Sequence, residues 1–213
     1  MTLFDDDDVG TVQETPVEPR TWEQVRGDAL GCRACPLWEP AGDTVFGEGP
    51  VPTRVMLVGE QPGDQEDRQG APFVGPAGEV LDRALAELEV DRSQLYVTNA
   101  VKHFKFEQRG KRRIHQTPNA SEVKACHPWL QSELALVRPE LVVLMGATAA
   151  KAILGSGFRV TKQHGVPVTT PYRGQFTATI HPSAVLRVPA DRRDETYAGM
   201  VEDLRASFAL LAG

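Results

Sequence analysis

Short apolar runs alternate with amphipathic helical patterns along this chain, and no other feature of the sequence constrains the fold more. The pattern predicts strands at 55–58, 95–98, 141–145 and 176–180, and helices at 21–30, 77–89, 121–137, 147–154 and from near Asp191 onward. Such alternation is typical of a mostly parallel sheet, because parallel neighbours need a crossover connection that covers a face of the sheet. We therefore expect an α/β fold, a three-layer α/β/α sandwich with a small central sheet.

Length and composition are those of a single domain. The chain has 213 residues and a hydrophobic content of 41%, enough for one core. An acidic run lies in a Thr, Pro and Glu-rich beginning, so we expect a disordered tail at 1–19 and one domain at 20–213. No apolar run approaches the roughly 18 residues of a membrane span. The odd number of cysteines argues against a disulfide framework and favours a reducing, cytoplasmic location.

Polar side chains follow the expected strands at the points where they end. Glu60, Asn99 and His181 each come directly after an apolar run, as does Gly146. Because the carboxyl ends of parallel strands meet at one edge of a sheet, we expect a carboxylate, an amide and an imidazole to converge there on a pocket. The segment 59–78 is predicted to be a loop of about 18 residues, a length that is uncommon without a function.

A basic segment interrupts the acidic balance of the chain. The formal net charge is −6, but between 102 and 113 six cations face a single acid, Glu107. The cations are Lys102, Lys105, Arg109, Lys111, Arg112 and Arg113. Such a cluster can neutralise phosphates whatever the global charge, which indicates a nucleic-acid contact. A solvated loop without a role is the alternative.

The three cysteines form a second group of candidate functional residues. Cys32 and Cys35 make a C-x-x-C pair after the first helix, and Cys126 lies in a helix much further along. Three thiolates leave a four-ligand site one ligand short. His103 is better placed to complete it than His127, because neighbours on a helix point about 100° apart. The set suits structural zinc or an iron–sulfur cluster, and three buried thiols are the alternative.

Four motifs resemble the uracil-DNA glycosylase superfamily, and in particular its branch with a [4Fe-4S] cluster. They are GEQPG at 59–63, PFVGPAG at 72–78, TNAVK at 98–102 and HPS at 181–183. Ordinary family-four members have a cysteine two residues after the position of Val101, where this chain has His103, and KRRIH at 111–115 is an insertion. Both departures resemble the family known as uracil-DNA glycosylase X, whose members bind uracil-containing DNA covalently through the histidine of that loop.

The resemblance implies a uracil-DNA glycosylase-like fold and a role for each residue of the expected pocket. His115 would attack the sugar carbon C1′, and Glu60 would orient that histidine or stabilise the cation. His181 would donate to the uracil oxygen where negative charge develops, Phe73 would stack on the base and Asn99 would pair with its polar edge. Further contacts with the substrate are expected from Gln61, Gly63, Lys102, Ser183 and Arg187. Arg113 would hold the reactive loop or a phosphate. A [4Fe-4S] cluster would be bound by Cys32, Cys35, His103 and Cys126.

The implied activity is a single turnover that leaves a monomeric protein attached to uracil-containing DNA, single-stranded or with the base flipped out. Two alternatives stay open. A conventional iron–sulfur uracil-DNA glycosylase would release uracil repeatedly and leave an abasic site. A zinc-stabilised nucleic-acid-binding module would catalyse nothing. The KRRIH segment tells against the first, and the converging Glu60, Asn99 and His181 tell against the second.

Overall fold

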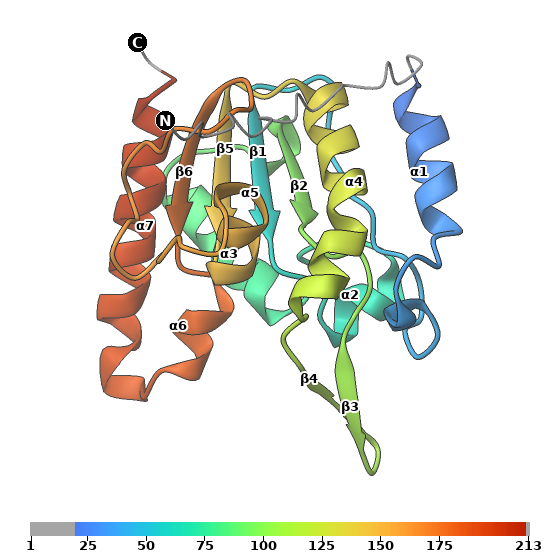
Figure 1. Cartoon of the computed structure of the whole chain (residues 1–213). Coiled ribbons are helices and arrows are strands. Elements are labelled where there is room, and N and C mark those ends of the chain that lie inside the picture. Colours follow the sequence, from blue (N-terminus) through green and yellow to red (C-terminus); the bar gives the residue numbers. More distant parts are fainter. Residues whose placement is uncertain (1–19, 212–213) are drawn as a thin grey trace, which may run out of the picture.

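The computed structural model describes residues 20–211 and contains a four-stranded sheet in which all neighbouring strands are parallel. Its strands are β1 (Val55–Gly59), β2 (Leu95–Asn99), β5 (Leu141–Met145) and β6 (Gln175–Thr179), in the spatial order β2-β1-β5-β6. The four predicted strands are confirmed to within one residue at each end. Because all four run the same way, their carboxyl ends share one edge of the sheet, at the bottom of Figure 1. The predicted tail lies outside the described residues.

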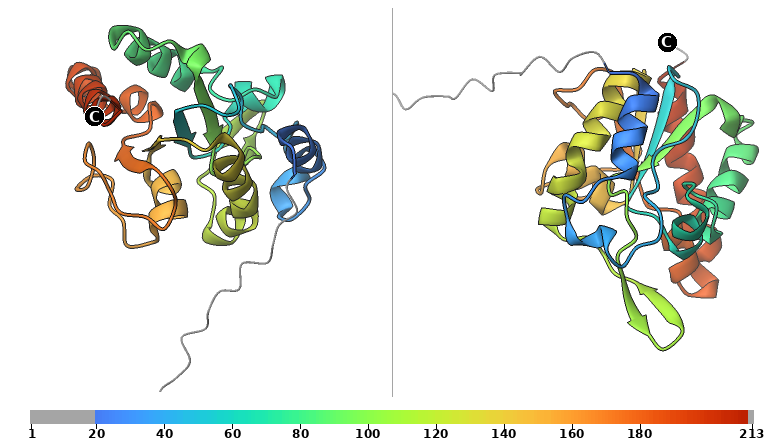
Figure 2. Two further views of the ribbon diagram at one scale, coloured as in Figure 1. Left: turned by 90° about the horizontal axis from the view of Figure 1, so that it is seen from above. Right: turned by 90° about the vertical axis from the view of Figure 1, so that its right-hand side faces the viewer.

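Helices cover both faces of the sheet, which confirms the three-layer arrangement. On one face lie α3 (Pro76–Glu87) and α7 (Arg193–Ala209), and on the other α4 (Ala120–Val137) and α5 (Ala147–Leu154). Figure 2 shows these pairs on opposite sides of the sheet when the molecule is seen from above. Successive strand residues point to opposite faces, so the apolar strands contribute to two separate cores.

Local signals set the helix ends. A capping box opens α1 (Trp22–Leu30): Thr21 Oγ1 accepts the Gln24 N–H, and the Gln24 side chain accepts the Thr21 N–H. Val25 and Ala29 of α1 are buried in a small core against Trp129 of α4. This contact places α1 outside α4, beyond the three main layers.

The C-terminal helix begins slightly later than expected. A 3₁₀ turn (Ala190–Arg192) precedes α7. Tyr197, Met200 and Leu204 are buried in the core that α7 covers, and Phe208 and Leu211 are partly buried against it. Other short elements are η1 (Pro36–Trp38), η2 (Arg92–Gln94) and α6 (Ser183–Arg187). Within residues 20–211, no helix is both long and apolar enough to cross a bilayer.

The segment 59–78, predicted to be a loop throughout, contains a helix, α2 (Asp64–Gln69). The Gly63 N–H donates to the Glu66 carboxylate at 3.0 Å, which caps the first turn. Gly70, with φ +69°, ends the helix in the left-handed conformation that favours glycine. This helix was not predicted because it is short and polar, so it lacks the apolar periodicity by which helices are recognised in a sequence.

The segment 99–117, where no strand was predicted, contains a β-hairpin. Its strands are β3 (Phe106–Arg109) and β4 (Arg112–His115), joined by a turn that begins at Gly110 with φ +60°. The hairpin projects from the edge where the strands of the main sheet end (Figure 1). His115 is therefore the last residue of a strand, and its position depends on how the hairpin is held.

Candidate active site

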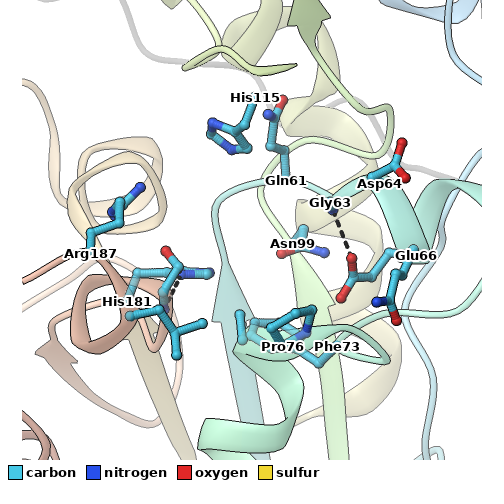
Figure 3. A pocket seen from close by; sticks show the side chains of 14 residues that line it. Gln61, Gly63, Asp64, Glu66, Phe73, Pro76, Asn99, His115, His181 and Arg187 are labelled. Carbon is cyan, nitrogen blue, oxygen red and sulfur yellow. Dashed lines mark hydrogen bonds between the residues drawn. The ribbon is translucent and has the colours of Figure 1, made fainter. Parts of the chain in front are cut away.

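A cavity of about 400 Å³ lies at the carboxyl-terminal edge of the sheet. Asn99 at the end of β2, His181 after β6 and His115 at the end of β4 all line it. A neighbouring hollow of about 260 Å³ shares both histidines and extends to Glu60 and Gly146. The four strand-end residues thus border one continuous region. The hairpin adds His115 to it, and Figure 3 shows Asn99, His115 and His181 around the first cavity.

Phe73 forms an apolar wall of the cavity. Its ring stacks on the His181 imidazole with 5.7 Å between centroids and 29° between planes. The Phe73 backbone has φ +56°, a strained value for a bulky residue, so its surroundings must hold it. Glu66 does so by accepting the N–H of Gly63 at 3.0 Å and that of Gly75 at 2.8 Å, on either side of Phe73. Glu66 was not among the predicted site residues, although a Glu three residues after a possible N-cap is a recognisable capping signal.

Two glycines allow the functional groups to come close together. A Cβ on Gly59 would lie 2.4 Å from Asn99 Oδ1 and 2.6 Å from Phe73 Cζ. Gly146 has φ +93°, and a Cβ there would lie 2.9 Å from the His181 Cβ. Larger residues at these two strand ends would therefore push the amide, the aromatic ring and the imidazole out of place.

Two buried polar atoms in the cavity have no hydrogen-bond partner in the part of the chain that the structure describes. They are Asn99 Oδ1 and His181 Nε2. An unpaired buried polar atom costs about 1–3 kcal/mol, so such atoms are rare outside sites that receive a ligand. The pair indicates a ligand whose own polar groups hydrogen-bond both atoms at the buried end of the cavity.

The hydrogen bonds of His181 determine which ring nitrogen carries its proton. The Ser183 N–H donates to His181 Nδ1 at 3.2 Å, and the Ser183 hydroxyl lies 2.8 Å from the same atom. Because an N–H can only donate, Nδ1 is the acceptor. Burial lowers the pKa of His181 to about 3, and the positive charge of Arg187 adds to the shift. The ring is therefore neutral near pH 7, and its unpaired Nε2 presents an N–H to the cavity.

His115 lies at the open end of the cavity, with 41% of its side chain exposed. Its Nε2 is 3.4 Å from Glu60 Oε1, and Thr148 Oγ1 donates to the other oxygen of Glu60 at 2.5 Å. Burial lowers the pKa of His115, Glu60 opposes that shift and Arg187 reinforces it. The imidazole is neutral near pH 7, so a ring nitrogen has a free electron pair with which to attack an electrophile.

Arg113 holds the hairpin against α2. Its guanidinium pairs with the carboxylates of Asp64 and Asp67, and lies 5.0 Å from the centroid of the Phe106 ring. Arg113 is 15% exposed and Asp67 is buried, so this is an interior contact. Of the two roles predicted for Arg113, its contacts fit the holding of the loop. Asp64 and Asp67 were missed because nothing in their sequence context points to a residue 46–49 positions away.

Gln61 holds the base of the same hairpin. Its side-chain amide donates to the Gln116 carbonyl at 3.0 Å and accepts the Lys105 N–H at 3.0 Å. His115 is thus presented by a hairpin that is fixed from two sides. The other predicted substrate contacts that line the cavity with Gln61 are Gly63, Ser183 and Arg187.

The basic segment is less cationic in three dimensions than its sequence indicates. Lys105 pairs with Glu122 at 2.9 Å and Arg109 with Glu107 at 2.9 Å, in addition to the pairs of Arg113. Among residues 20–211, Lys111 and Arg112 near the hairpin tip are the cations of this segment without a carboxylate within salt-bridge distance. Three of the six cations, Lys102, Lys105 and Arg113, pair with acids from outside the segment, which its composition alone does not reveal.

Lys102 was predicted to contact the substrate, and this is wrong. Its side chain is buried, its Nζ lies 2.5 Å from Glu133 Oε2, and it also donates to Thr98 Oγ1 and to the Asn99 carbonyl at 2.7 Å each. The ammonium group therefore supports the end of β2 from inside the protein. The sequence does not show whether the long side chain of a lysine after a strand turns toward the interior or toward solvent.

Replacing Lys102 with methionine should destabilise the protein by about 3–5 kcal/mol, because the buried Glu133 carboxylate would lose its counter-charge. Urea denaturation of the wild type and the variant measures this difference. The matched double variant, Lys102→Met with Glu133→Gln, removes both charges and should recover most of the loss. Equal stability of the wild type and the single variant would show that the pair is not buried in solution.

Residues 46–205 match a family model described as the uracil DNA glycosylase superfamily. The chain belongs to the uracil-DNA glycosylase superfamily. One relative is the Type-4 uracil-DNA glycosylase of Pyrobaculum aerophilum, which is 38% identical to this chain over 168 residues. The aligned residues cover 76% of this chain and 82% of that protein. The Type-4 uracil-DNA glycosylase of Thermotoga maritima is 35% identical over 174 residues, 81% and 85% of the two chains. A Type-5 uracil-DNA glycosylase of P. aerophilum is 34% identical over 132 residues, 55% of each chain.

In this superfamily member the three cysteines are free and lie near one another. Burial raises the pKa of the Cys126 thiol to about 11, and the charges of Cys35 and Cys32 raise it further. The Trp129 indole N–H donates to Cys32 Sγ at 3.2 Å, and the Lys102 backbone N–H donates to Cys126 Sγ at 3.2 Å. Donors of this kind stabilise thiolates that bind metal.

The fourth expected ligand, His103, shares a cavity with Cys32. His103 Nε2 lies 2.9 Å from the Thr44 hydroxyl, the hydrogen bond that it makes in this structure. Within residues 20–211, no three His, Cys, Asp or Glu side chains are close enough together to hold a single metal ion. The zinc alternative therefore has no structural support. Cys32 and His103 line this cavity, and Cys35 packs against Cys126 in a small apolar cluster. Three thiols and an imidazole are a donor set that suits an iron–sulfur cluster.

Proposed function

We propose that this protein recognises uracil in DNA, breaks the N-glycosidic bond and becomes attached through His115 to the deoxyribose C1′. It would act once, and it would do so as a cytoplasmic monomer. The KRRIH segment carries the resemblance to the uracil-DNA glycosylase X family that this function implies. One observation supports this most strongly: a neutral imidazole is held at the open end of the cavity whose buried end presents Asn99 Oδ1 and His181 Nε2. A water molecule would stand in the place of His115 in a hydrolytic enzyme.

The unpaired groups match the edge of a uracil ring. Asn99 Oδ1 can accept the N–H of uracil, and His181 Nε2 can donate to a uracil carbonyl. Cytosine offers an unprotonated ring nitrogen where uracil has that N–H, so two acceptors would face each other. A buried mismatch of this kind is worth a discrimination of about 10²-fold or more. The base must leave the stack to reach this depth, since a uracil inside a duplex is out of reach.

The reaction conserves atoms and charge. The C1′–N1 bond breaks with its electron pair on uracil, and the developing anion is stabilised by the His181 N–H. The sugar cation takes the electron pair of a His115 ring nitrogen, which forms the C1′–N bond and an imidazolium. That imidazolium loses its remaining N–H proton, and uracil gains one. Glu60, 3.4 Å from the His115 ring, stabilises both cations on the way.

The product explains why the reaction would run once. The new bond joins C1′ to a ring nitrogen, as the bond in the substrate does, and its leaving group has no donor equivalent to His181 beside it. Each protein molecule therefore consumes one uracil and stays on its DNA.

We further propose that Cys32, Cys35, Cys126 and His103 bind a [4Fe-4S] cluster with a structural role. The cluster would fix the His103 end of the segment that becomes the hairpin, so it would support the placement of His115 from a third side. His103 precedes β3 by three residues, and His115 is the last residue of β4. The cluster would take no part in bond breaking.

Replacing His103 with cysteine should preserve the cluster, because thiolate is the usual ligand of iron–sulfur centres. We expect brown protein with visible absorption, and with iron and sulfide contents equal to those of the wild type. His103→Ala is the matched variant without a fourth ligand and should lose colour. Colourless wild-type protein that contains zinc would contradict the assignment.

A multi-turnover uracil-DNA glycosylase is the second candidate, because two of the relatives reported above are named Type-4 uracil-DNA glycosylases. The two functions share recognition and bond cleavage and differ in what captures the sugar cation. Incubation with a deoxyuridine oligonucleotide separates them. Our proposal requires an SDS-stable protein–DNA band and added nucleotide mass on the peptide that contains His115. Free uracil in excess of protein, without such a band, would establish the second candidate.

A further inference from the structure

Glu60 is held in place by one side-chain hydrogen bond. Thr148 Oγ1 donates to Glu60 Oε2 at 2.5 Å, whereas Glu60 Oε1 faces His115 Nε2 at 3.4 Å. The Glu60 side chain is 20% exposed, so it is shielded from most of the solvent that could otherwise hold it. No other side-chain donor within residues 20–211 hydrogen-bonds this carboxylate. Its orientation toward His115 therefore depends on Thr148.

Rigid elements bring Thr148 to this position. Residues Val58 of β1 and Leu144 of β5 are partners in the parallel sheet. Glu60 follows the first by two positions, and Thr148 follows the second by four, in the first turn of α5. A hydroxyl inside a helix commonly bonds to a carbonyl one turn earlier, and Thr148 instead bonds to a carboxylate that directly follows the neighbouring strand β1.

We propose that Thr148 is a positioning residue: it locks the Glu60 carboxylate against His115 and so favours capture of the sugar cation by imidazole over capture by water. This inference rests on the proposed covalent function. The carboxylate stabilises the positive charge that His115 gains when its electron pair forms the bond to C1′. Without Thr148, Glu60 can rotate about its side-chain bonds toward solvent, and that stabilisation weakens.

The test compares Thr148→Val, which keeps the shape and removes the donor, with Thr148→Ser, which keeps the donor. Each protein is mixed in excess with a deoxyuridine oligonucleotide, and the adduct and free abasic DNA are measured over time. We expect Thr148→Val to form adduct about 10-fold more slowly, as for loss of a hydrogen bond to a charged group, with more abasic DNA. The rate of adduct formation by Thr148→Ser should lie within about 2-fold of the wild-type rate.

The pH profile adds a readout that loss of fold would not shift. Adduct formation needs neutral His115, so its rate falls as the pH drops through the His115 pKa. Glu60 raises that pKa, while burial and Arg187 lower it. If Thr148→Val frees Glu60, the His115 pKa falls, and the acid limb of the profile moves to lower pH. The plateau rate falls at the same time.

Thr53→Val is the matched control, because Thr53 precedes β1 at the opposite edge of the sheet and its hydroxyl donates to the Gln94 carbonyl at 2.6 Å. It should leave the rate and the pH profile unchanged. Should Thr148→Val fold poorly, Thr148→Ala with the same serine comparison replaces it. A wild-type profile for the donor-free variant, or no recovery with serine, would overturn the inference. Absence of adduct in the wild type itself would instead refute the proposed function.

Discussion

Replacing His115 with serine is expected to abolish the SDS-stable complex with uracil-containing DNA and to convert the protein into a multi-turnover glycosylase. Serine is small enough to leave room for water on the face of the sugar that the imidazole occupies. The substitution leaves the groups that break the bond unchanged, including Asn99 and His181 at the buried end of the cavity. Glu60 remains beside the vacated position, where its carboxylate can orient and deprotonate the water.

The measurement is a gel for covalent complex together with quantification of free uracil at a tenfold excess of DNA. His127→Ser is the matched control, because His127 lies on α4 and its Nε2 is 3.2 Å from the Tyr172 hydroxyl. That control should crosslink as the wild type does. Undiminished crosslinking by His115→Ser would refute the assignment of the nucleophile.

Replacing His181 with leucine should lower the single-turnover rate of uracil release by about 10²–10³-fold, as when one donor to a developing oxyanion is removed elsewhere. Leucine fills much of the buried volume but offers no N–H. Adduct formation should fall by the same factor, because bond cleavage precedes capture by His115. Ser183→Ala is the milder comparison: the Ser183 N–H still donates to His181 Nδ1, so we expect a loss of about 10-fold or less.

The pKa of His181 gives this prediction a pH dependence. A pKa of about 3 leaves the ring neutral from mildly acidic pH upward. Uracil release should therefore show no limb due to His181 between about pH 5 and 9, well above the range in which this imidazole takes up a proton. A decline of the wild-type rate with rising pH in that range, absent in His181→Leu, would indicate that a charged imidazolium is the donor.

Much of the fold could be predicted because the relevant forces are local in sequence. Each strand of the main sheet is a run of apolar residues bounded by polar ones, and burial on both faces requires such a run. The convergence of Glu60, Asn99 and His181 followed from one rule of topology, that parallel strands end together. The hairpin and α2 escaped prediction because both are polar and short, and their stability comes from contacts with each other.

The sequence by itself determined the layered α/β fold, the edge where the site forms and the chemical groups that meet there, because periodicity and strand direction follow from the order of residues. Tertiary structure alone decided how those groups are held. Arg113 pairs with acids on α2, Lys102 turns inward to Glu133, and Thr148 of α5 donates to Glu60 beyond the neighbouring strand β1. Each contact joins residues 31–88 positions apart. The direction of a long or polar side chain depends on which partner packing brings within reach, and no local pattern records that.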